Sequence, residues 1–392
     1  MTPNSEHSRK HFTRKHLVLL LGILGSVLII LLVGVGILRG PARQQSGASP
    51  TPSAVALSPM PTNSVSPLIF GTNMSLFASA STDQMLDSPA TQKALQQIHV
   101  QIIRMPVRPG VSEALEIKGA QAIKQIGAVP LVILNGPLVS DPLSVDRRIV
   151  QDMKQIFGNE TVYYEFGNEE DLQGVSTQRY VTSWNTIIPQ LKHLSPNAHF
   201  IGPVNYKYSR GNLTAFLQQA QPRPDEVSWH EYVCGSSSQP APCISGIDAW
   251  TDHIRDARDM MQKTIGTVLP IMITEWNYAP DLNVLPNGQV TSNDGKHDNA
   301  AFMNTWTTKA IQTLAANRVF ASMQYAATNT PLPMIGLDNN ITPQGTAFQR
   351  MYQQIIIDKQ QPTPTTSAQI QSRGEASIAQ IDAYMERRKS VQ

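Results

Sequence analysis

Short apolar runs alternate with longer amphipathic stretches between residues 68 and 358. Runs rich in β-branched and aromatic residues predict strands, whereas apolar residues three or four positions apart predict helices. The predicted strands are Leu68–Asn73, Gln101–Met105, Val129–Leu134, Val162–Gly167, His199–Pro203, Glu226–His230, Pro270–Glu275 and Phe320–Tyr325. The predicted helices include Ser112–Ile126, Val145–Phe157, Thr177–Leu194, Ile247–Ile265, Ala300–Ala315 and Thr346–Ile357.

Eight strand–helix units within residues 68–358 match the size of a (β/α)8 TIM barrel. The alternative is an open, doubly wound sheet, which usually has a glycine-rich phosphate-binding turn after its first strand. The corresponding segment here is FGTNMS, which lacks that turn. We therefore predict an α/β fold with a (β/α)8 barrel over residues 68–358.

An uncharged apolar run extends from Leu17 to Leu38. As a helix it is long enough to cross the ~30 Å hydrocarbon core of a membrane. Four basic residues lie just before it, so the positive-inside rule places residues 1–16 in the cytoplasm and the barrel outside. A cleaved signal peptide is the alternative, although its apolar region usually has only about 7–15 residues. We expect a single-pass protein of the cell membrane with an extracytoplasmic barrel domain.

Two further segments flank the predicted barrel. Residues 39–67 are rich in Pro, Ser and Thr, which is typical of an extended linker. Residues 359–392 form a polar tail, in which spaced apolar residues between 370 and 384 allow a short helix. The sequence leaves open whether this tail docks on the barrel or is disordered.

Composition and charge narrow the classes of partner. The chain is 41% hydrophobic and only 15% charged, which excludes a largely disordered protein. The net charge of +2 hides an acidic body, because residues 44–358 hold 20 basic and 25 acidic residues. Nucleic-acid binding depends on a basic surface that neutralises phosphates. We therefore predict no nucleic-acid partner.

Polar and aromatic side chains gather at the ends of the predicted strands, where (β/α)8 barrels carry their active sites. The candidates for substrate binding are Arg104, Asn135, Asn168, His230, Tyr232, Trp276, Gln324 and Tyr325. Two carboxylates, Glu169 and Glu275, lie at the ends of different strands and are predicted to face each other across the barrel mouth. Two such groups can cleave a glycosidic bond if one is a protonated acid and the other an ionised nucleophile. Arg104 is a candidate cation for keeping Glu275 ionised.

The ordered set of Asn168-Glu169, His230-x-Tyr232 and Thr274-Glu275-Trp276 resembles the clan of retaining (β/α)8 glycoside hydrolases. The strings FGNEED and ITEWNY are most similar to its β-xylosidase, α-L-arabinofuranosidase and β-glucuronidase/heparanase branches. The resemblance covers the barrel but neither end of the chain.

The resemblance implies a role for each matching position. Glu169 would be the general acid/base and Glu275 the nucleophile. Asn168 would hydrogen-bond the sugar hydroxyl next to the reacting carbon, and Tyr232 would donate a hydrogen bond to the nucleophile. His230 and Arg104 would support the pocket.

Two positions depart from the pattern of these relatives. Glu170 stands where proline often follows the acid/base, and Gln324-Tyr325 stands where the last strand often ends in tryptophan. These departures leave two alternatives open besides a hydrolase. One is a surface glycan-binding protein that has lost catalysis, and the other is a transglycosylase with the same catalytic pair.

Some of these residues also have structural interpretations. Glu165 has the same inward parity as Glu169 and is predicted to be a buried, hydrogen-bonded carboxylate of the barrel interior. Glu170 and Asp171 could begin the next helix, where negative charge suits the helix dipole. Trp276 is either an aromatic surface for sugar stacking or a core residue.

Arg104 and His230 could likewise belong to the core of the barrel. His230, Glu231 and an Asp of the 281–298 loop could in principle bind a metal ion, but they lack the spacing of a metal site, so we predict no metal. No cofactor is predicted, because acid/base and nucleophilic carboxylates suffice. Cys234 and Cys243 lie in a loop that the predicted topology places outside the cell, and there a disulfide is expected. The overall prediction is a membrane-anchored retaining glycosidase that acts on an oligo- or polysaccharide.

Overall fold

The computed structural model describes residues 64–76, 83–107, 110–234, 239–279, 283–284, 290–291 and 295–359, all within one compact unit that spans Met60–Gln392. The predicted membrane segment 17–38, most of the 39–67 linker and most of the 359–392 tail lie outside these residues. Within the described part of the chain, no helix has the length and apolarity needed to cross a membrane.

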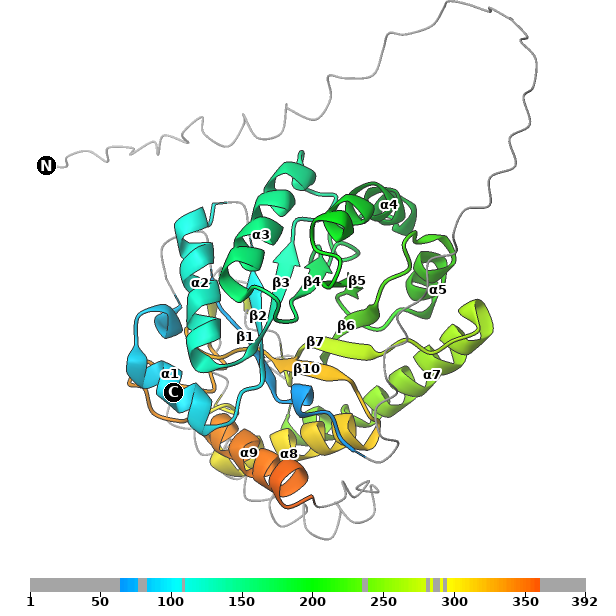
Figure 1. Ribbon diagram of the computed structural model, residues 1–392. Coiled ribbons are helices and arrows are strands. Elements are labelled where there is room, and N and C mark those ends of the chain that lie inside the picture. Colours follow the sequence, from blue (N-terminus) through cyan, green and yellow to red (C-terminus); the bar gives the residue numbers. More distant parts are fainter. Residues whose placement is uncertain are drawn as a thin grey trace, which may run out of the picture. The chain divides into compact units, whose positions relative to one another are not determined.

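Eight parallel strands close into a barrel in the order β1-β10-β7-β6-β5-β4-β3-β2 (Figure 1). Their bounds are β1 Gly71–Asn73, β2 Ile102–Pro106, β3 Val129–Leu134, β4 Tyr163–Phe166, β5 His199–Asn205, β6 Glu226–Tyr232, β7 Ile271–Asn277 and β10 Ala321–Gln324. The barrel and the positions of its eight strands confirm the prediction. The strand predicted at Leu68–Asn73 begins later than expected, because Pro67 starts a 3₁₀ turn, Pro67–Ile69, that Ser66 caps.

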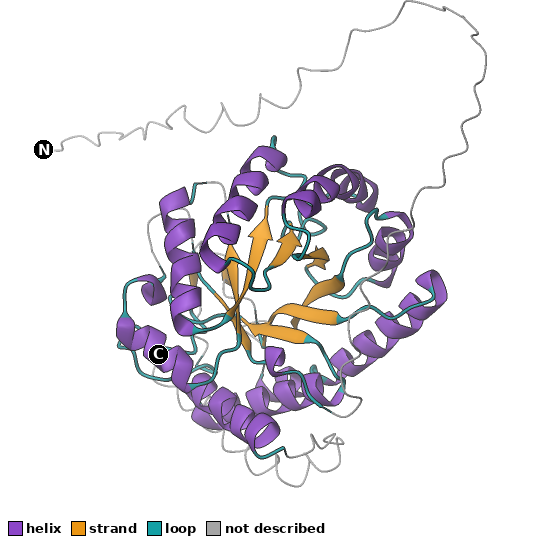
Figure 2. Ribbon diagram, in the orientation of Figure 1, coloured by secondary structure: helices purple, strands orange, loops and turns teal. Residues whose placement is uncertain are grey.

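The helices surround this ring of strands (Figure 2). Their bounds are α1 Pro89–Gln97, α2 Glu113–Ile126, α3 Pro142–Phe157, α4 Thr177–Leu194, α5 Arg210–Gln219, α6 Pro240–Ser245, α7 Asp248–Ile265, α8 Ala300–Ala316 and α9 Pro343–Tyr352. The predicted helix Thr346–Ile357 starts three residues earlier, at Pro343, and its last turn, Gln353–Ile357, is a π-helix. A two-stranded hairpin, β8 Asn283–Val284 and β9 Val290–Thr291, follows β7.

Local signals explain where these helices begin and end. In α2, the Ser112 side chain accepts a hydrogen bond from the Leu115 backbone N–H, and Gly127 ends the helix with a left-handed φ of 82°. In α8, five apolar side chains at helical spacing are all fully buried, which shows that one face of the helix packs on the barrel. They are Phe302, Trp306, Ala310, Ile311 and Leu314.

The barrel has two apolar cores, because successive side chains of a strand point to opposite faces. The larger core fills the space between sheet and helices and includes Trp184, Trp250, Trp276 and Trp306. The smaller core fills the barrel interior with Ile102, Leu131, Tyr163, Ile201, Met272, Ala321 and Met323. These interior residues define which side chains of β2, β3, β4, β5, β7 and β10 point inward.

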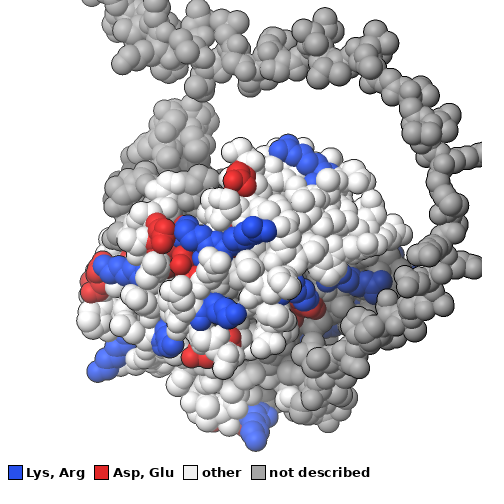
Figure 3. Space-filling model, turned by 45° about the horizontal axis from the view of Figure 1, so that its top comes forward, with Lys and Arg blue, Asp and Glu red and all other residues white. Residues whose placement is uncertain are grey.

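The surface carries charge of both signs. On the face shown in Figure 3, Lys and Arg side chains are interspersed with Asp and Glu, without a continuous region of one sign.

A disulfide joins Cys234, just after β6, to Cys243 in α6, which confirms the predicted pairing. The Cys234 backbone N–H donates to the carbonyl of Tyr278 beyond β7, and the Trp306 indole donates to the carbonyl of Cys243. The disulfide therefore fastens the segment after β6 to its neighbours at the mouth of the barrel.

Candidate active site

An irregularity in β7 aims Glu275 into the barrel mouth. β6 pairs Trp229 with Ile273 and then His230 with Glu275, so β7 has one extra residue, Thr274. The pairing of β7 with β10 shows the same extra residue in β7, because Ser322 pairs with Ile273 and Gln324 with Trp276. Such a β-bulge reverses the alternation of side chains beyond it. Met272 faces the barrel interior, and after the bulge Glu275 does so as well.

Glu169 is held by unusual backbone at the end of β4. Its φ is +54°, a left-handed conformation that non-glycine residues rarely adopt. Its backbone N–H donates to the carbonyl of Val204, which has a φ of +59° at a bulge in β5. Two strained residues thus hold each other in place, as is common where a protein positions a functional group.

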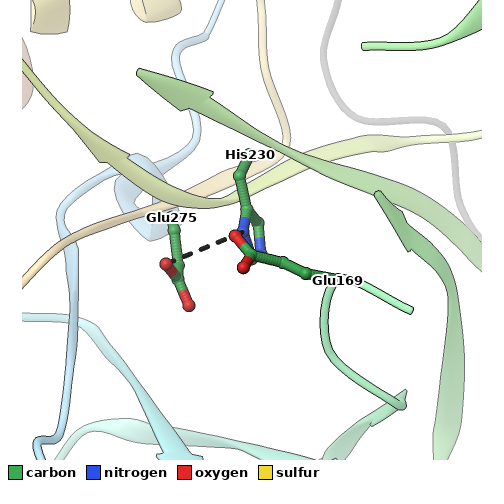
Figure 4. Close-up of side chains that lie close together, drawn as sticks. All are labelled: Glu169, His230 and Glu275. Atoms are coloured by element: carbon green, nitrogen blue, oxygen red, sulfur yellow. Dashed lines mark hydrogen bonds and ion pairs between the residues drawn. The ribbon is translucent and has the colours of Figure 1, made fainter. Parts of the chain in front are cut away.

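The two glutamates meet at His230 of β6 (Figure 4). His230 Nδ1 lies 2.7 Å from Glu169 Oε1 and 3.6 Å from Glu275 Oε2. One carboxylate oxygen of Glu169 and one of Glu275 lie within 4.8 Å of each other. Glu169 and Glu275 therefore share one small space at the carboxyl ends of β4 and β7.

Arg104 of β2 lies beneath this pair and is 1% exposed. Its guanidinium donates to Glu275 Oε1 at 2.5 Å, to Glu165 Oε2 at 2.5 Å and to Asn168 Oδ1 at 2.6 Å. A fourth hydrogen bond, of 3.1 Å, reaches the Asn73 side chain. Arg104 thus holds the nucleophile candidate and the sugar-binding candidate Asn168 in one rigid arrangement. Glu165 is fully buried in this network, as predicted.

Glu275 has the environment of an ionised carboxylate. Burial alone raises the pKa of Glu275, but His230, Arg104 and the Tyr232 hydroxyl outweigh it and lower that pKa below its ordinary value. The Tyr232 hydroxyl donates to Glu275 Oε2 at 2.7 Å. Burial lowers the pKa of His230, but Glu275 and Glu169 reverse this effect, so the pKa of His230 is raised. At neutral pH, Glu275 is therefore ionised.

Two of the predicted substrate contacts are wrong. Trp276 is fully buried and packs against Trp250 and Trp306, because the residue after the β7 bulge points outward. Gln324 is also fully buried, and its amide donates to the carbonyl of Leu332 and to the Gln344 side chain. Both residues support the barrel wall and cannot touch a sugar.

Other predicted residues divide between the site and its support. Asn135 donates to Asp146 of α3 and so fastens the end of β3 to a helix, although it also lines a pocket beside Asn168. Tyr325 follows β10 and is 7% exposed. Glu170 and Asp171 do not begin a helix, since α4 starts at Thr177 with Ser176 as its cap. Asp171 instead accepts a hydrogen bond from the Tyr206 backbone N–H.

Two residues of the site were not among the sequence candidates. Asn73 ends β1 and donates to the carbonyls of Thr274 and Met323 while accepting from Arg104. Tyr206 follows β5, and its ring stacks against that of Tyr232 with centroids 6.4 Å apart. Both residues are polar and lie at the carboxyl end of a strand, as the other candidates do. The same pattern in the sequence therefore predicts them.

Glu169, His230 and Glu275 are close enough together to coordinate a metal ion. However, Glu275 already lies 2.5 Å from the Arg104 guanidinium and accepts a hydrogen bond from Tyr232. A cation here would be placed beside another buried cation, which is unfavourable at low dielectric. These contacts suit a Glu275 carboxylate that is kept ionised to act as a nucleophile better than they suit a metal ligand.

Several solved structures have a similar fold. An α-L-arabinofuranosidase of family 51 from Bifidobacterium longum matches with a TM-score of 0.54 and 13% identity over 74% of each chain. A family 51 arabinofuranosidase from Xanthomonas axonopodis pv. citri matches with a TM-score of 0.56 and 16% identity over 75% of this chain and 74% of that one. The chain has the (β/α)8 fold of these glycoside hydrolases.

A third enzyme with this glycoside hydrolase fold is a 4-O-α-L-rhamnosyl-β-D-glucuronidase from Fusarium oxysporum 12S. It matches with a TM-score of 0.57 and 14% identity over 75% of this chain and 71% of that one. No family model and no curated protein matches the sequence. At these identities the comparisons establish the fold alone.

Two buried carboxyls near the mouth predict how stability depends on pH. Burial raises the pKa of Asp146 to about 7 against hydrogen bonds from Asn135, and it raises the pKa of Glu170 to about 7 against the charge of Arg179. Both pKa values are lower in the unfolded chain, so the folded state binds more protons between about pH 4 and 7. Folding stability should therefore fall as pH rises through that window.

We expect the melting temperature to be several degrees higher at pH 5 than at pH 8. The double variant Asp146→Asn, Glu170→Gln should flatten this difference, because neither amide titrates. Differential scanning fluorimetry across the pH range measures both proteins. A melting temperature that rises from pH 5 to pH 8 in the unchanged protein would contradict the assignment.

Proposed function

We propose that the protein is a retaining glycoside hydrolase that cleaves O-glycosidic bonds by double displacement, with Glu169 as acid/base and Glu275 as nucleophile. The observation that carries this proposal is that one carboxylate oxygen of Glu169 and one of Glu275 lie within 4.8 Å of each other. Retaining enzymes place their carboxyl groups about 5–5.5 Å apart, whereas inverting enzymes leave about 6.5–9.5 Å for a water molecule. The glycoside hydrolases with the same fold support the substrate class.

The surroundings of each carboxyl suit its proposed role. In the first step, a Glu275 oxygen bonds to the anomeric carbon, the glycosidic C–O bond breaks, and Glu169 gives its proton to the leaving oxygen. Arg104 and Tyr232 keep Glu275 ionised before the attack. In the second step, Glu169 takes a proton from water, which replaces Glu275 at the same carbon. The anomeric configuration of the product is therefore that of the substrate.

The first test is a panel of aryl β-xyloside, α-L-arabinofuranoside, β-glucuronide, β-glucoside and β-galactoside. We expect one of these to be hydrolysed, and proton NMR of the first product should show the anomer of the substrate. The inverted anomer would refute double displacement. Binding of glycans without any turnover would instead favour a surface glycan-binding protein. Transfer of the sugar to an added acceptor would identify a transglycosylase with the same intermediate.

We also propose that residues 17–38 anchor the enzyme in the cell membrane with the barrel outside. The support is the uncharged apolar run with basic residues before it. The Cys234–Cys243 disulfide is consistent with this topology, since disulfides persist mainly in oxidising compartments. The protein should remain in the membrane pellet after alkaline carbonate extraction, and protease added to intact cells should digest the barrel. Release into the supernatant would refute the anchor.

A further inference from the structure

The residue directly after the proposed acid/base has a carboxyl group without a partner. Glu170 is 5% exposed, and its Oε2 is buried without any hydrogen bond. Across the described residues, no group donates a hydrogen bond to either of its carboxyl oxygens. A buried carboxyl in this state is costly, and native proteins rarely keep one without a reason. Its position suggests that the reason is a ligand.

Two glycines make the room for this carboxyl. A Cβ atom at Gly136, after β3, would lie 1.9 Å from Glu170 Oε1, and one at Gly167, after β4, would lie 2.8 Å from the same oxygen. Oε1 therefore occupies space that a side chain at Gly136 or Gly167 would fill. Both glycines line the same pocket as Glu170.

This pocket has a volume of about 330 Å³ and lies among the ends of β2, β3 and β4. That is within the ~300–1,000 Å³ range of small-ligand sites. Aliphatic side chains such as Pro106, Ile133 and Leu138 form part of its wall, and the amides of Asn168 and Gln173 provide polar groups. A sugar presents both kinds of surface, because its C–H faces are apolar and its rim carries hydroxyls.

Asn168 connects the pocket to the catalytic pair. Its Oδ1 accepts from Arg104, which also holds Glu275, so the amide group of Asn168 lies between the two spaces. The pocket therefore adjoins the hydrogen-bond network that holds Glu275.

We propose that this pocket is a subsite for a neutral sugar unit, in which Glu170 accepts a hydrogen bond from a sugar hydroxyl. The inference rests on the proposed glycosidase function and specifies its substrate as an oligosaccharide. A uronic acid does not fit, because its carboxylate would face the Glu170 carboxyl. The nearby cations are already engaged, Arg104 by Glu165 and Glu275, and Arg179 by the carbonyl of Pro137.

The test is calorimetric titration of the full chain in detergent, with Glu275→Gln added to prevent turnover. The probes are xylotriose, arabinotriose, cellotriose and, as the acidic comparison, a hyaluronan tetrasaccharide. At pH 8, where Glu170 is ionised because its pKa is about 7, we expect one neutral probe to bind, and Glu170→Met to weaken it by about tenfold or more, because a hydrogen bond to a charged group is lost. The Glu170→Met variant should also melt at a higher temperature, because methionine removes a buried group that lacks a partner.

Two controls separate recognition from a structural role. Glu160→Met makes the same change at an exposed residue before β4 and should alter neither quantity. Glu170→Gln keeps the shape of the side chain and should retain more affinity than Glu170→Met.

A lower melting temperature with unchanged affinity would show that Glu170 is only structural. Tighter binding of the acidic probe, or no binding of any neutral probe, would also overturn the subsite. Because binding is measured without hydrolysis, neither result depends on the outcome of the aryl glycoside panel.

Discussion

Replacing Glu275 with glutamine is expected to lower kcat on the best aryl glycoside by roughly 10⁴–10⁶-fold, the range seen when a catalytic nucleophile is removed. An amide cannot form the glycosyl intermediate, and Arg104 would lose the negative charge that it now faces at 2.5 Å. The substrate should still bind, because its hydroxyl contacts remain. Stopped assays with a concentrated enzyme measure the residual rate, and an equilibrium titration measures binding.

A matched control for this variant is Glu226→Gln. Glu226 is also buried, at 1% exposed, and also pairs with a histidine, since its Oε1 lies 2.7 Å from His199 Nδ1. It begins β6, four residues before His230, which places it about 13 Å lower in the barrel. We expect Glu226→Gln to change stability while leaving kcat within a few fold. A Glu275→Gln variant that kept full activity would remove Glu275 from the mechanism.

Replacing Glu169 with glutamine should give a loss that depends on the leaving group. A phenyl glycoside needs a proton on its leaving oxygen, so its kcat/KM should fall by about 10²–10⁴-fold, which is typical for loss of a general acid. A 2,4-dinitrophenyl glycoside leaves as a stable anion and needs no proton. Its kcat/KM should therefore fall far less.

The second step of the same variant should be slow even on the activated substrate. Glu169 is the proposed base that activates water, so the glycosyl-Glu275 intermediate should accumulate in its absence. Stopped-flow absorbance should show a burst of dinitrophenolate close to one equivalent, and intact-protein mass spectrometry should show the added sugar. Equal losses on both substrates, without a burst, would show that Glu169 is not the acid/base.

These two predictions involve residues that the sequence had already placed at strand ends. The alternation of apolar runs and amphipathic stretches specified eight strands, and all eight lie in the barrel, although the first begins later than expected. The rule that polar residues at the carboxyl ends of strands meet at one mouth brought Glu169, His230, Tyr232 and Arg104 into one cluster. Both inferences depend on local periodicity and on parallel strand direction, which the sequence encodes directly.

The same rule was wrong for Trp276 and Gln324, because it ignores which face of the strand a residue occupies. In a regular β7, Met272, Thr274 and Trp276 would share the inward face and Glu275 would point outward. Tertiary pairing with β6 and β10 inserts Thr274 as a bulge, and this turns Glu275 inward and Trp276 into the helix-facing core.

The sequence by itself determined the barrel, the position of its strands and the pair of glutamates at its mouth. Only the tertiary structure decided which neighbours of those glutamates face the site, because a single extra residue in a strand reverses every side chain after it. It also decided the surroundings of Glu170, whose carboxyl lies against Gly136 and Gly167 in two loops that follow different strands. Residues far apart in the chain set that environment, so no local pattern contains it.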